Sequence, residues 1–308
     1  MSRIYDSILT LHSFTFDKFH EENRPWLHGG DKDHVPAETA YLSSKFAFPD
    51  GTGHIKVSRE AKGNVLILAS PNSEAEFMDI LLANDALKRM RCKSISLAMP
   101  YWLGSRQDRV CDYGEPLTTK VHADLINSCL FERVHIWHPH SDVTPALINN
   151  VVIHPGIARK VLIGRGLHSV LVAPDAGAAK ATFELSKRFG IPMVSAEKTR
   201  DMTNGKILSF SLHANLDDIN GKDVIVLDDC ITNGGTFLGL LGKIVEFSPA
   251  SVSLCVTHAD HKEGVLKMVA SGGFDHIYIS NSRNWVNYLP RDTRGVTVYE
   301  LTMYDGHS

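Results

Sequence analysis

Short apolar runs alternate along the chain with longer segments of mixed apolar and polar residues. The runs are rich in Val, Ile and Leu, which is typical of strands buried on both faces of a parallel sheet. We expect such strands at residues 65–70, 94–100, 133–137, 169–174, 192–195, 224–227, 252–257 and 276–279. Residues 77–89 have apolar positions at helical spacing, and helices are also expected at residues 118–130, 178–189 and 237–244. This alternation predicts an α/β fold in which helices cover both faces of parallel sheets.

The predicted strands and helices fall into two series that join near residues 149–153. A chain of 308 residues is long enough to build two hydrophobic cores. We therefore expect two domains of similar architecture, at residues 1–152 and 153–308. Residues 19–40 are polar and rich in charge, Gly, Pro and His, so we expect a long loop there.

Composition narrows the class of protein. Hydrophobic residues make up 43% and charged residues 22%, as in ordinary globular domains, and the net charge of −3 gives no global basic field for nucleic acid. No apolar run is long enough to span a bilayer, and the first residues lack a signal-peptide pattern. The five cysteines are scattered without a C-x-x-C pair, which favours reduced thiols. We expect a cytoplasmic protein without membrane or nucleic-acid partners.

One segment, residues 224–236, carries the strongest chemical signal. An apolar strand is followed by the adjacent carboxylates of Asp228 and Asp229 and by the turn Thr232-Asn-Gly-Gly-Thr236. Ligands of open α/β sheets bind at the carboxyl ends of strands, and a glycine turn that opens a helix presents backbone N–H groups to a phosphate. Paired carboxylates beside such a turn suit the 2- and 3-hydroxyls of a ribose. The segment therefore predicts a site for a phosphorylated ribose.

Further motifs follow one another in an order that matches one known family. They are Phe48-Pro-Asp-Gly51, Pro100-Tyr-Trp-Leu-Gly-Ser-Arg-Gln-Asp-Arg109, Gly114-Glu-Pro-Leu-Thr-Thr-Lys120, Ala173-Pro-Asp-Ala-Gly177 and Glu197-Lys-Thr-Arg200. With these motifs the chain resembles the ribose-phosphate diphosphokinases, or phosphoribosyl-diphosphate synthetases, over most of its length. The resemblance implies two tandem phosphoribosyltransferase-type (type I) domains, each a mainly parallel sheet flanked by helices.

The resemblance also implies roles for particular residues. Residues implied to bind ATP are Phe48, Asp50, Arg106, Gln107, Asp108 and Arg109. Residues implied to bind the ribose phosphate are Asp228, Asp229, Thr232, Asn233, Gly234, Gly235 and Thr236. Residues implied to be catalytic are Lys198, Arg200 and His140, the first two on a mobile loop. Residues implied to bind metal are His140 and Asp175.

The implied reaction is the transfer of a diphosphoryl group from ATP. The anomeric hydroxyl of a 5-phosphoribosyl acceptor attacks the β-phosphorus, and AMP leaves. Such a transfer depends on positioning and charge stabilisation, with Mg²⁺ bridging the phosphates. The family's adenine-binding hairpin tip, here at Phe48 and Asp50, reaches into a neighbouring subunit's site. A homo-oligomer, dimer or hexamer, is therefore expected.

The chain departs from the family at a few positions. His138 stands where the family usually has Asp, Thr232 and Asn233 replace Asp and Thr of the phosphate loop, and Thr52 stands for a Glu. The ATP-side residues are largely retained, while the acceptor-side loop has lost a negative charge. The ADP-ribose diphosphate synthetases of phage NAD-rebuilding pathways fit this pattern. Ribose 5-phosphate and ADP-ribose are therefore both expected acceptors.

Two other functions stay open from the sequence. A phosphoribosyltransferase would consume phosphoribosyl diphosphate and release free diphosphate, whereas a synthetase releases AMP from ATP. A non-catalytic nucleotide-binding regulatory homologue would bind ligands and release no AMP. His138 and Thr232 favour the regulatory homologue, and the retained charged residues oppose it.

Overall fold

The computed structural model describes residues 5–11, 38–200 and 207–283, together with residues 285, 286, 289, 293, 295–301 and 303; the side chains of residues 38, 39, 43, 200, 207 and 208 are not described. The chain divides into two compact units, one formed by residues 1–155 and 300–308 and the other by residues 156–299. Of the loop expected at residues 19–40, only residues 38–40 are described, and they form a short strand.

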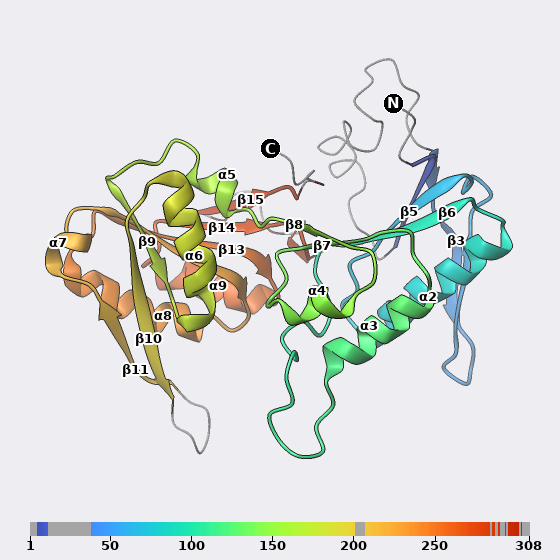
Figure 1. Cartoon of the computed structure of the whole chain (residues 1–308), viewed down its shortest axis with the longest axis horizontal. Helices are drawn as coiled ribbons and strands as arrows, with labels where there is room; N and C mark the ends of the chain where they lie inside the picture. Colours follow the sequence, from blue (N-terminus) through green and yellow to red (C-terminus); the bar gives the residue numbers. More distant parts are fainter. Residues whose placement is uncertain are drawn as a thin grey trace. The chain divides into compact units, whose positions relative to one another are not determined.

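The first unit is built on a six-stranded sheet with strand order β2-β1-β5-β6-β7-β8, in which every neighbouring pair is parallel (Figure 1). The strands are β1 (Ser7–Thr10), β2 (Glu38–Ala40), β5 (Asn64–Leu68), β6 (Ser94–Met99), β7 (Val134–Trp137) and β8 (Val151–His154). An antiparallel hairpin is formed by β3 (Leu42–Ala47) and β4 (Gly53–Val57). The helices are α2 (Glu74–Arg89), α3 (Thr118–Ser128) and α4 (Val143–Leu147).

Local sequence explains why α2 begins and ends where it does. The hydroxyl of Ser73 accepts a hydrogen bond from the backbone N–H of Glu76 and so caps the first turn. Acidic residues in the first turn and Lys88 and Arg89 in the last turn complement the helix dipole. The apolar face that packs into the core consists of Phe77, Ile80, Ala83 and Leu87.

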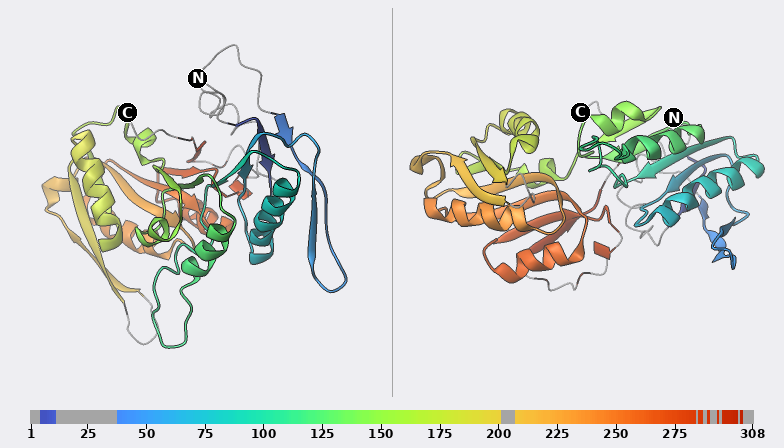
Figure 2. Two further views of the ribbon diagram at one scale, coloured as in Figure 1. Left: turned by 45° about the vertical axis from the view of Figure 1, so that its right-hand side comes forward. Right: turned by 90° about the horizontal axis from the view of Figure 1, so that it is seen from below.

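The second unit is built on a seven-stranded sheet with order β11-β10-β9-β12-β13-β14-β15, and the pair β10–β11 is antiparallel (Figure 2). The strands are β9 (Ser169–Ala173), β10 (Met193–Arg200), β11 (Ile207–His213), β12 (Asp223–Ile231), β13 (Ser251–Ala259), β14 (His276–Ser280) and β15 (Val296–Tyr299). The helices are α5 (Ala158–Leu162), α6 (Ala176–Phe189), α7 (Leu216–Ile219), α8 (Gly235–Ile244), the 3₁₀ helix η1 (Val245–Phe247) and α9 (Lys262–Ser271). Helices lie against the sheet in each unit, so the predicted α/β class with mainly parallel sheets is confirmed.

The structure differs from the expected elements where polar residues belong to strands. Strand β12 continues through Asp228 and Asp229 to Ile231, and β10 continues to Arg200. The polar residues of β12 had indicated the end of a strand, and those of β10 had indicated a loop. Both segments nevertheless pair with a neighbouring strand, and the hydrogen bonds of that pairing keep the polar residues in the sheet. The described residues after Tyr299 belong to the first unit, whereas we expected the second domain to run to residue 308. Among the described residues, no helix has the length and apolar character needed to cross a bilayer.

Candidate functional site

Adjacent strands of the second sheet bring charged side chains together at its carboxyl edge. Strands β10, β9 and β12 are neighbours and run parallel, with Ser195 beside Ala173 and Val172 beside Val226. Parallel strands end at the same edge, so the residues that follow these pairs lie close together. These residues, all predicted site residues, are Lys198, Asp175, Asp228 and Asp229.

Asp175 is fixed at the start of α6. Its Oδ1 accepts hydrogen bonds from the backbone N–H groups of Gly177 (3.0 Å) and Ala178 (3.2 Å), and its Oδ2 forms an ion pair with Nζ of Lys198. Burial alone would raise the pKa of Asp175, but the hydrogen bond and charge of Lys198 and the two N–H groups lower the pKa below its usual value. An oriented, ionised carboxylate is therefore present at this edge.

Asp228 is in the opposite electrostatic situation. Burial and then the charge of Asp229 raise the pKa of Asp228 well above its usual value, and Asp175 adds to the effect. The Oδ1 atom of Asp228 accepts a hydrogen bond of 2.9 Å from the backbone N–H of Asp229. The carboxylates repel each other, so hydroxyl donors or a cation bound at this edge would relieve the repulsion.

The glycine turn after β12 leads into α8 and contains the predicted phosphate-binding residues 232–236. Gly234 has a φ of 71°, which glycine adopts at little cost, and no described side chain caps the helix. A Cβ added to Gly264 of α9 would lie 1.8 Å from the carbonyl oxygen of Thr232, and one added to Gly234 would lie 2.4 Å from Cε of Met268. Helix α9 thus holds the turn by direct backbone contact. Sequence reasoning missed Gly264 and Met268, because nothing in the sequence indicates which distant helix packs against the turn.

Lys198 and Arg200 lie on strand β10, which corrects the expectation that both belong to a loop. Lys198 pairs with Phe210 across the β10–β11 ladder, and the register shifts between Thr199 and Arg200. Residues 201–206, the rest of the expected loop, lie outside the described residues. The ladder with β11 fixes the backbone of Lys198, whereas the pairing of β10 with β9 ends at Ser195.

In the first unit, the predicted nucleotide segment follows β6. Tyr101, Trp102 and Ser105 are buried, so the start of the segment is anchored in the core. The predicted ATP-binding residues come next: Arg106, Gln107 and Arg109 are exposed and Asp108 is half-buried. The structure therefore brings these four residues together on one short, anchored stretch.

The tip of the β3–β4 hairpin carries the other predicted ATP-binding residues. The rings of Phe46, Phe48 and His54 form an exposed cluster, with centroids 5.0 Å apart for the two phenylalanines. The carboxylate of Asp50 accepts a 2.8 Å hydrogen bond from the backbone N–H of Thr52, and this contact lowers the pKa of Asp50. Asp50 therefore also has a structural role in the turn.

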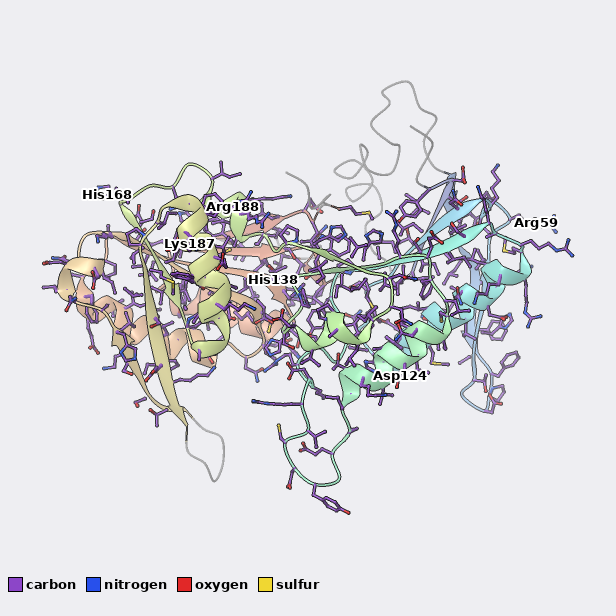
Figure 3. The ribbon with its side chains drawn as sticks, in the orientation of Figure 1. Arg59, Asp124, His138, His168, Lys187 and Arg188 are labelled. Atoms are coloured by element: carbon purple, nitrogen blue, oxygen red, sulfur yellow. The ribbon has the colours of Figure 1, made fainter. Side chains whose placement is uncertain are left out.

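His138, labelled in Figure 3, follows β7, and His140 comes two residues later. His138 has a φ of 38° and its backbone N–H donates to the carbonyl oxygen of His154 at 2.9 Å, so the chain turns sharply here. The side chain of His140 is exposed. His140 belongs to the first unit and Asp175 to the second. Their joint role as metal ligands stays a prediction.

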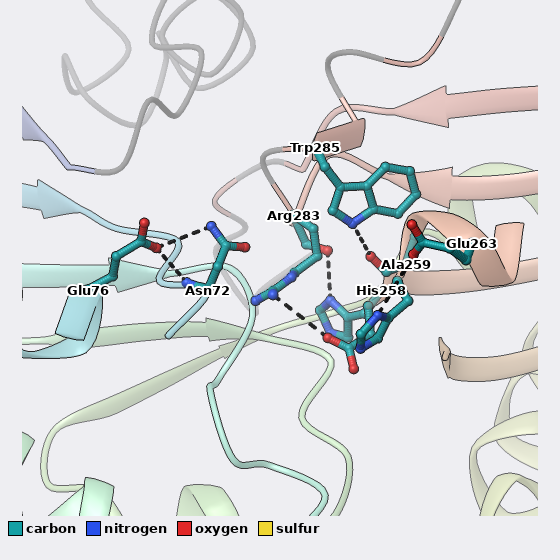
Figure 4. A network of polar contacts seen from close by, with 10 residues as sticks. Asn72, Glu76, His258, Ala259, Glu263, Arg283 and Trp285 are labelled. Carbon is teal, nitrogen blue, oxygen red and sulfur yellow. Dashed lines mark hydrogen bonds and ion pairs between the residues drawn. The ribbon is translucent and has the colours of Figure 1, made fainter. Parts of the chain in front are cut away.

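A polar network at the ends of β13 and β14 is a second feature that sequence reasoning missed (Figure 4). The backbone N–H of Asp260 donates to the carbonyl oxygen of Ile231 at 2.9 Å, directly before the glycine turn. The Asp260 carboxylate lies 3.8 Å from Nη2 of Arg283, and Nδ1 of His258 lies 2.9 Å from Oγ of Ser282. Polar side chains thus continue along the carboxyl edge beyond the acidic residues.

A parallel sheet with an acidic pair and a glycine turn at its carboxyl edge defines a phosphoribosyltransferase-type α/β protein, here with a second parallel-sheet unit preceding it. The phosphoribosyl transferase domain family matches residues 157–286, and the N-terminal domain of ribose phosphate pyrophosphokinase matches residues 38–129. The chain belongs to the ribose-phosphate pyrophosphokinase family, a family of enzymes, and the predicted resemblance is confirmed.

Curated relatives and a solved structure agree with this membership. The ribose-phosphate pyrophosphokinase of Thermosipho africanus is 26% identical over 245 residues, covering 76% of this chain and 76% of the relative. That of Sulfolobus acidocaldarius is 28% identical over 264 residues, covering 83% of this chain and 87% of the relative. The crystal structure of phosphoribosylpyrophosphate synthetase from Mycobacterium smegmatis has a TM-score of 0.77 at 21% identity, covering 96% of this chain and 94% of that one. At this identity, the structural likeness shows the fold.

Proposed function

We propose that this protein transfers the β,γ-diphosphoryl group of ATP to the C1 hydroxyl of a 5-phosphoribosyl acceptor and releases AMP. The observation that carries the proposal is the ion pair between Lys198 of β10 and Asp175 at the start of α6, beside the carboxylates of Asp228 and Asp229. Family membership and the names of the curated relatives support the same reaction.

In the proposed reaction, Asp228 and Asp229 accept hydrogen bonds from the ribose 2- and 3-hydroxyls. The N–H groups at the start of α8 bind the 5-phosphate, since a helix N-terminus favours an anion. The C1 hydroxyl oxygen forms a bond to the β-phosphorus, the bond from that phosphorus to the α,β-bridging oxygen breaks, and AMP leaves with that oxygen. The hydroxyl proton passes to solvent. Lys198, with Arg200, stabilises the charge on the transferred group.

The acidic edge fits a divalent cation by the chemistry of its donors. Asp175, Asp228 and Asp229 offer oxygen atoms, which Mg²⁺ prefers, and burial followed by the charge of Asp229 raises the pKa of Asp228, so a cation here would be favourable. We propose that Asp175, with His140, holds Mg²⁺. When bound, Mg²⁺ would offset charge on the ATP phosphates.

ATP is proposed to lie against Arg106 and Gln107 of the first unit, with an arginine fork suited to phosphate oxygens. The exposed rings at the hairpin tip suit stacking on adenine. We propose that Phe48 and Asp50 do so in the site of a neighbouring subunit. The protein is thus proposed to act as a homo-oligomer, either a dimer or a hexamer.

We propose two candidate acceptors, ribose 5-phosphate and ADP-ribose, and the phosphate turn bears on the choice between them. Thr232 and Asn233 are uncharged, and Asn233 is exposed. Ribose 5-phosphate carries a terminal phosphate, whereas the corresponding phosphate of ADP-ribose continues into a diphosphate and an adenosine. An open, uncharged turn suits the ADP-ribose diphosphate, and the names of the relatives favour ribose 5-phosphate.

The test is AMP release from ATP and Mg²⁺, measured in parallel with ribose 5-phosphate and with ADP-ribose. AMP formation that depends on either acceptor supports the proposal and identifies the acceptor. Nucleotide binding without AMP release from either acceptor would favour a regulatory homologue. Release of diphosphate from phosphoribosyl diphosphate and a base would favour a phosphoribosyltransferase.

A further inference from the structure

His122 is a buried polar side chain on α3 that contacts the backbone of the nucleotide segment. Only 3% of the residue is exposed, although most histidines are at least partly solvated. Its Nδ1 lies 2.8 Å from the carbonyl oxygen of Leu103, three residues before Arg106. Its Nε2 lies 2.8 Å from Oε2 of Glu74, and its ring stacks on Phe77 with centroids 4.5 Å apart. Helix α2 therefore fixes the ring that contacts the segment.

The chemistry of the two partners defines what His122 does. A carbonyl oxygen and a carboxylate both accept hydrogen bonds and cannot donate. Nδ1 can therefore bind the Leu103 carbonyl only by donating a hydrogen to it, while Nε2 contacts the Glu74 carboxylate on the other side of the ring. The contact with Leu103 is thus a restraint on the segment's backbone.

The segment is also fitted closely around this ring. Gly104 has a φ of +80°, and a Cβ added there would lie 2.9 Å from Nδ1 of His122. The carbonyl oxygen of Gly104 accepts a 2.9 Å hydrogen bond from the backbone N–H of Gln107, which closes the turn that carries Arg106. The backbone N–H of Thr119 on α3 donates to the carbonyl oxygen of Gln107 at 3.3 Å. Helix α3 therefore holds both ends of this turn.

We infer that His122 is a positioning residue for ATP: it holds the Leu103–Gly104 backbone so that Arg106 and Gln107 present their side chains to the nucleotide. The inference rests on the proposed function, because that function makes ATP the ligand of this turn. His122 is nearly inaccessible, so its effect passes through the backbone that it holds. A misplaced turn weakens ATP binding in the ground state and in the transition state alike, so KM for ATP rises while kcat changes little.

Two substitutions separate the two hydrogen bonds of the ring. In His122→Asn the amide nitrogen takes the place of Nδ1 and can still donate to Leu103, whereas in His122→Gln it takes the place of Nε2 and faces Glu74. We expect KM for ATP to rise about tenfold in His122→Gln and less than about threefold in His122→Asn. Direct titration with ATP, without acceptor, should give the same ranking in Kd. Circular dichroism verifies that each variant is folded.

Glu74→Ala tests the role of His122 by removing the exposed partner of its ring, a change that does not put folding at risk. The Glu74 side chain is 72% exposed, so its removal leaves the core intact, yet the ring loses its charged partner. We expect a rise in KM for ATP of about threefold. The matched control on α3 is Asp124→Asn, whose carboxylate is 60% exposed and pairs with Lys120 (Figure 3); its KM for ATP should equal that of the wild type.

The outcomes distinguish this inference from the proposed function. Equal KM values in the Asn and Gln variants, or values unchanged from the wild type, would overturn the positioning role and leave AMP formation by the wild type intact. If both His122 variants fail to fold, an unchanged KM in Glu74→Ala would overturn it. A wild-type protein that binds no ATP and releases no AMP would remove the proposed function, and the positioning role with it.

Discussion

The two units use the same kind of sheet to present side chains of different charge. In the first unit, the residues beyond β6 and β7 include Arg106 and His140, which are exposed on connecting segments. In the second unit, the residues at the carboxyl edge include Asp175 and Asp228, which are half-buried at strand ends. Burial, the charge of Asp229 and, to a smaller extent, the charge of Asp175 raise the pKa of Asp228. The two first-unit side chains are a cation and an imidazole, and the two second-unit side chains are carboxylates.

Because of this difference, we expect substitutions in the two units to impair different properties of the protein. The first unit's groups depend on a backbone held in place by Trp102 and His122, so damage there should weaken binding. The second unit's groups depend on one another's charges, so damage there should change turnover and stability. A buried group of the first unit also has a shifted pKa: burial, with the charge of His154, lowers the pKa of His135 to about 3, so His135 is neutral at pH 7.

The largest effect is expected for Lys198→Ala. Removing a cation that stabilises the transferred group costs on the order of a hundredfold in turnover. The variant should keep its fold, because the Lys198 side chain lies at the sheet edge and is 22% exposed. The measurement is kcat for AMP formation together with the thermal midpoint.

The control for this substitution is Lys243→Ala, which removes a lysine of α8 whose side chain is 44% exposed and paired with Glu246. Turnover of that variant should match the wild type. A Lys198→Ala enzyme that keeps near-normal turnover would show that this cation is not needed for the transfer. It would also contradict the view that charged groups of the second unit determine turnover.

Much of the fold could be predicted from the sequence, because apolar runs such as residues 224–227 and 252–257 have the pattern of buried parallel strands. The ends of β12 and β10 could not be predicted, because Asp228 and Lys198 are polar and only their partners on the neighbouring strands keep them in the ladder. Asp228 and Asp229 were predicted because ligands of α/β sheets bind at the carboxyl ends of strands. Asp175 and Lys198 were implied only by the resemblance to the family. Gly264 and His122 were missed, since a supporting contact from a distant helix leaves no local pattern.

An intermediate effect is expected for Gly264→Ala, which tests how α9 supports the phosphate turn. The new Cβ would meet the carbonyl oxygen of Thr232 at 1.8 Å, so the turn or the helix must shift. We expect KM for the acceptor to rise about tenfold or more, because small displacements at a binding site are costly. The free energy of unfolding should fall by about 1–3 kcal/mol.

The matched control is Gly242→Ala on α8, where nothing lies within 4 Å of an added Cβ. An alanine in a helix interior should stabilise by about 0.5–1 kcal/mol. Urea unfolding and acceptor titration of both variants separate the helix effect from the clash. A Gly264→Ala protein that matches Gly242→Ala in both measurements would show that α9 does not hold the turn.

The smallest effects, of opposite sign, are expected for Asp228→Asn and Asp175→Asn. The folded state raises the pKa of Asp228, so its contribution to stability is present at low pH and is lost as pH rises through that raised pKa. At pH 7 the charge is therefore unfavourable, and Asp228→Asn should stabilise by about 0.5–2 kcal/mol while it impairs acceptor binding.

The folded state lowers the pKa of Asp175, so its contribution is complete above the unfolded pKa and is lost only as pH falls through the lowered value. Asp175→Asn should therefore destabilise at pH 7, by about 0.5–3 kcal/mol, because Lys198 loses its partner. Thermal midpoints measured from pH 7 downward should show the gain in Asp228→Asn disappearing first and the loss in Asp175→Asn persisting to lower pH. If both variants shift the thermal midpoint in the same direction at pH 7, the view that the Asp228 carboxylate destabilises the folded state and the Asp175 carboxylate stabilises it through its ion pair is contradicted.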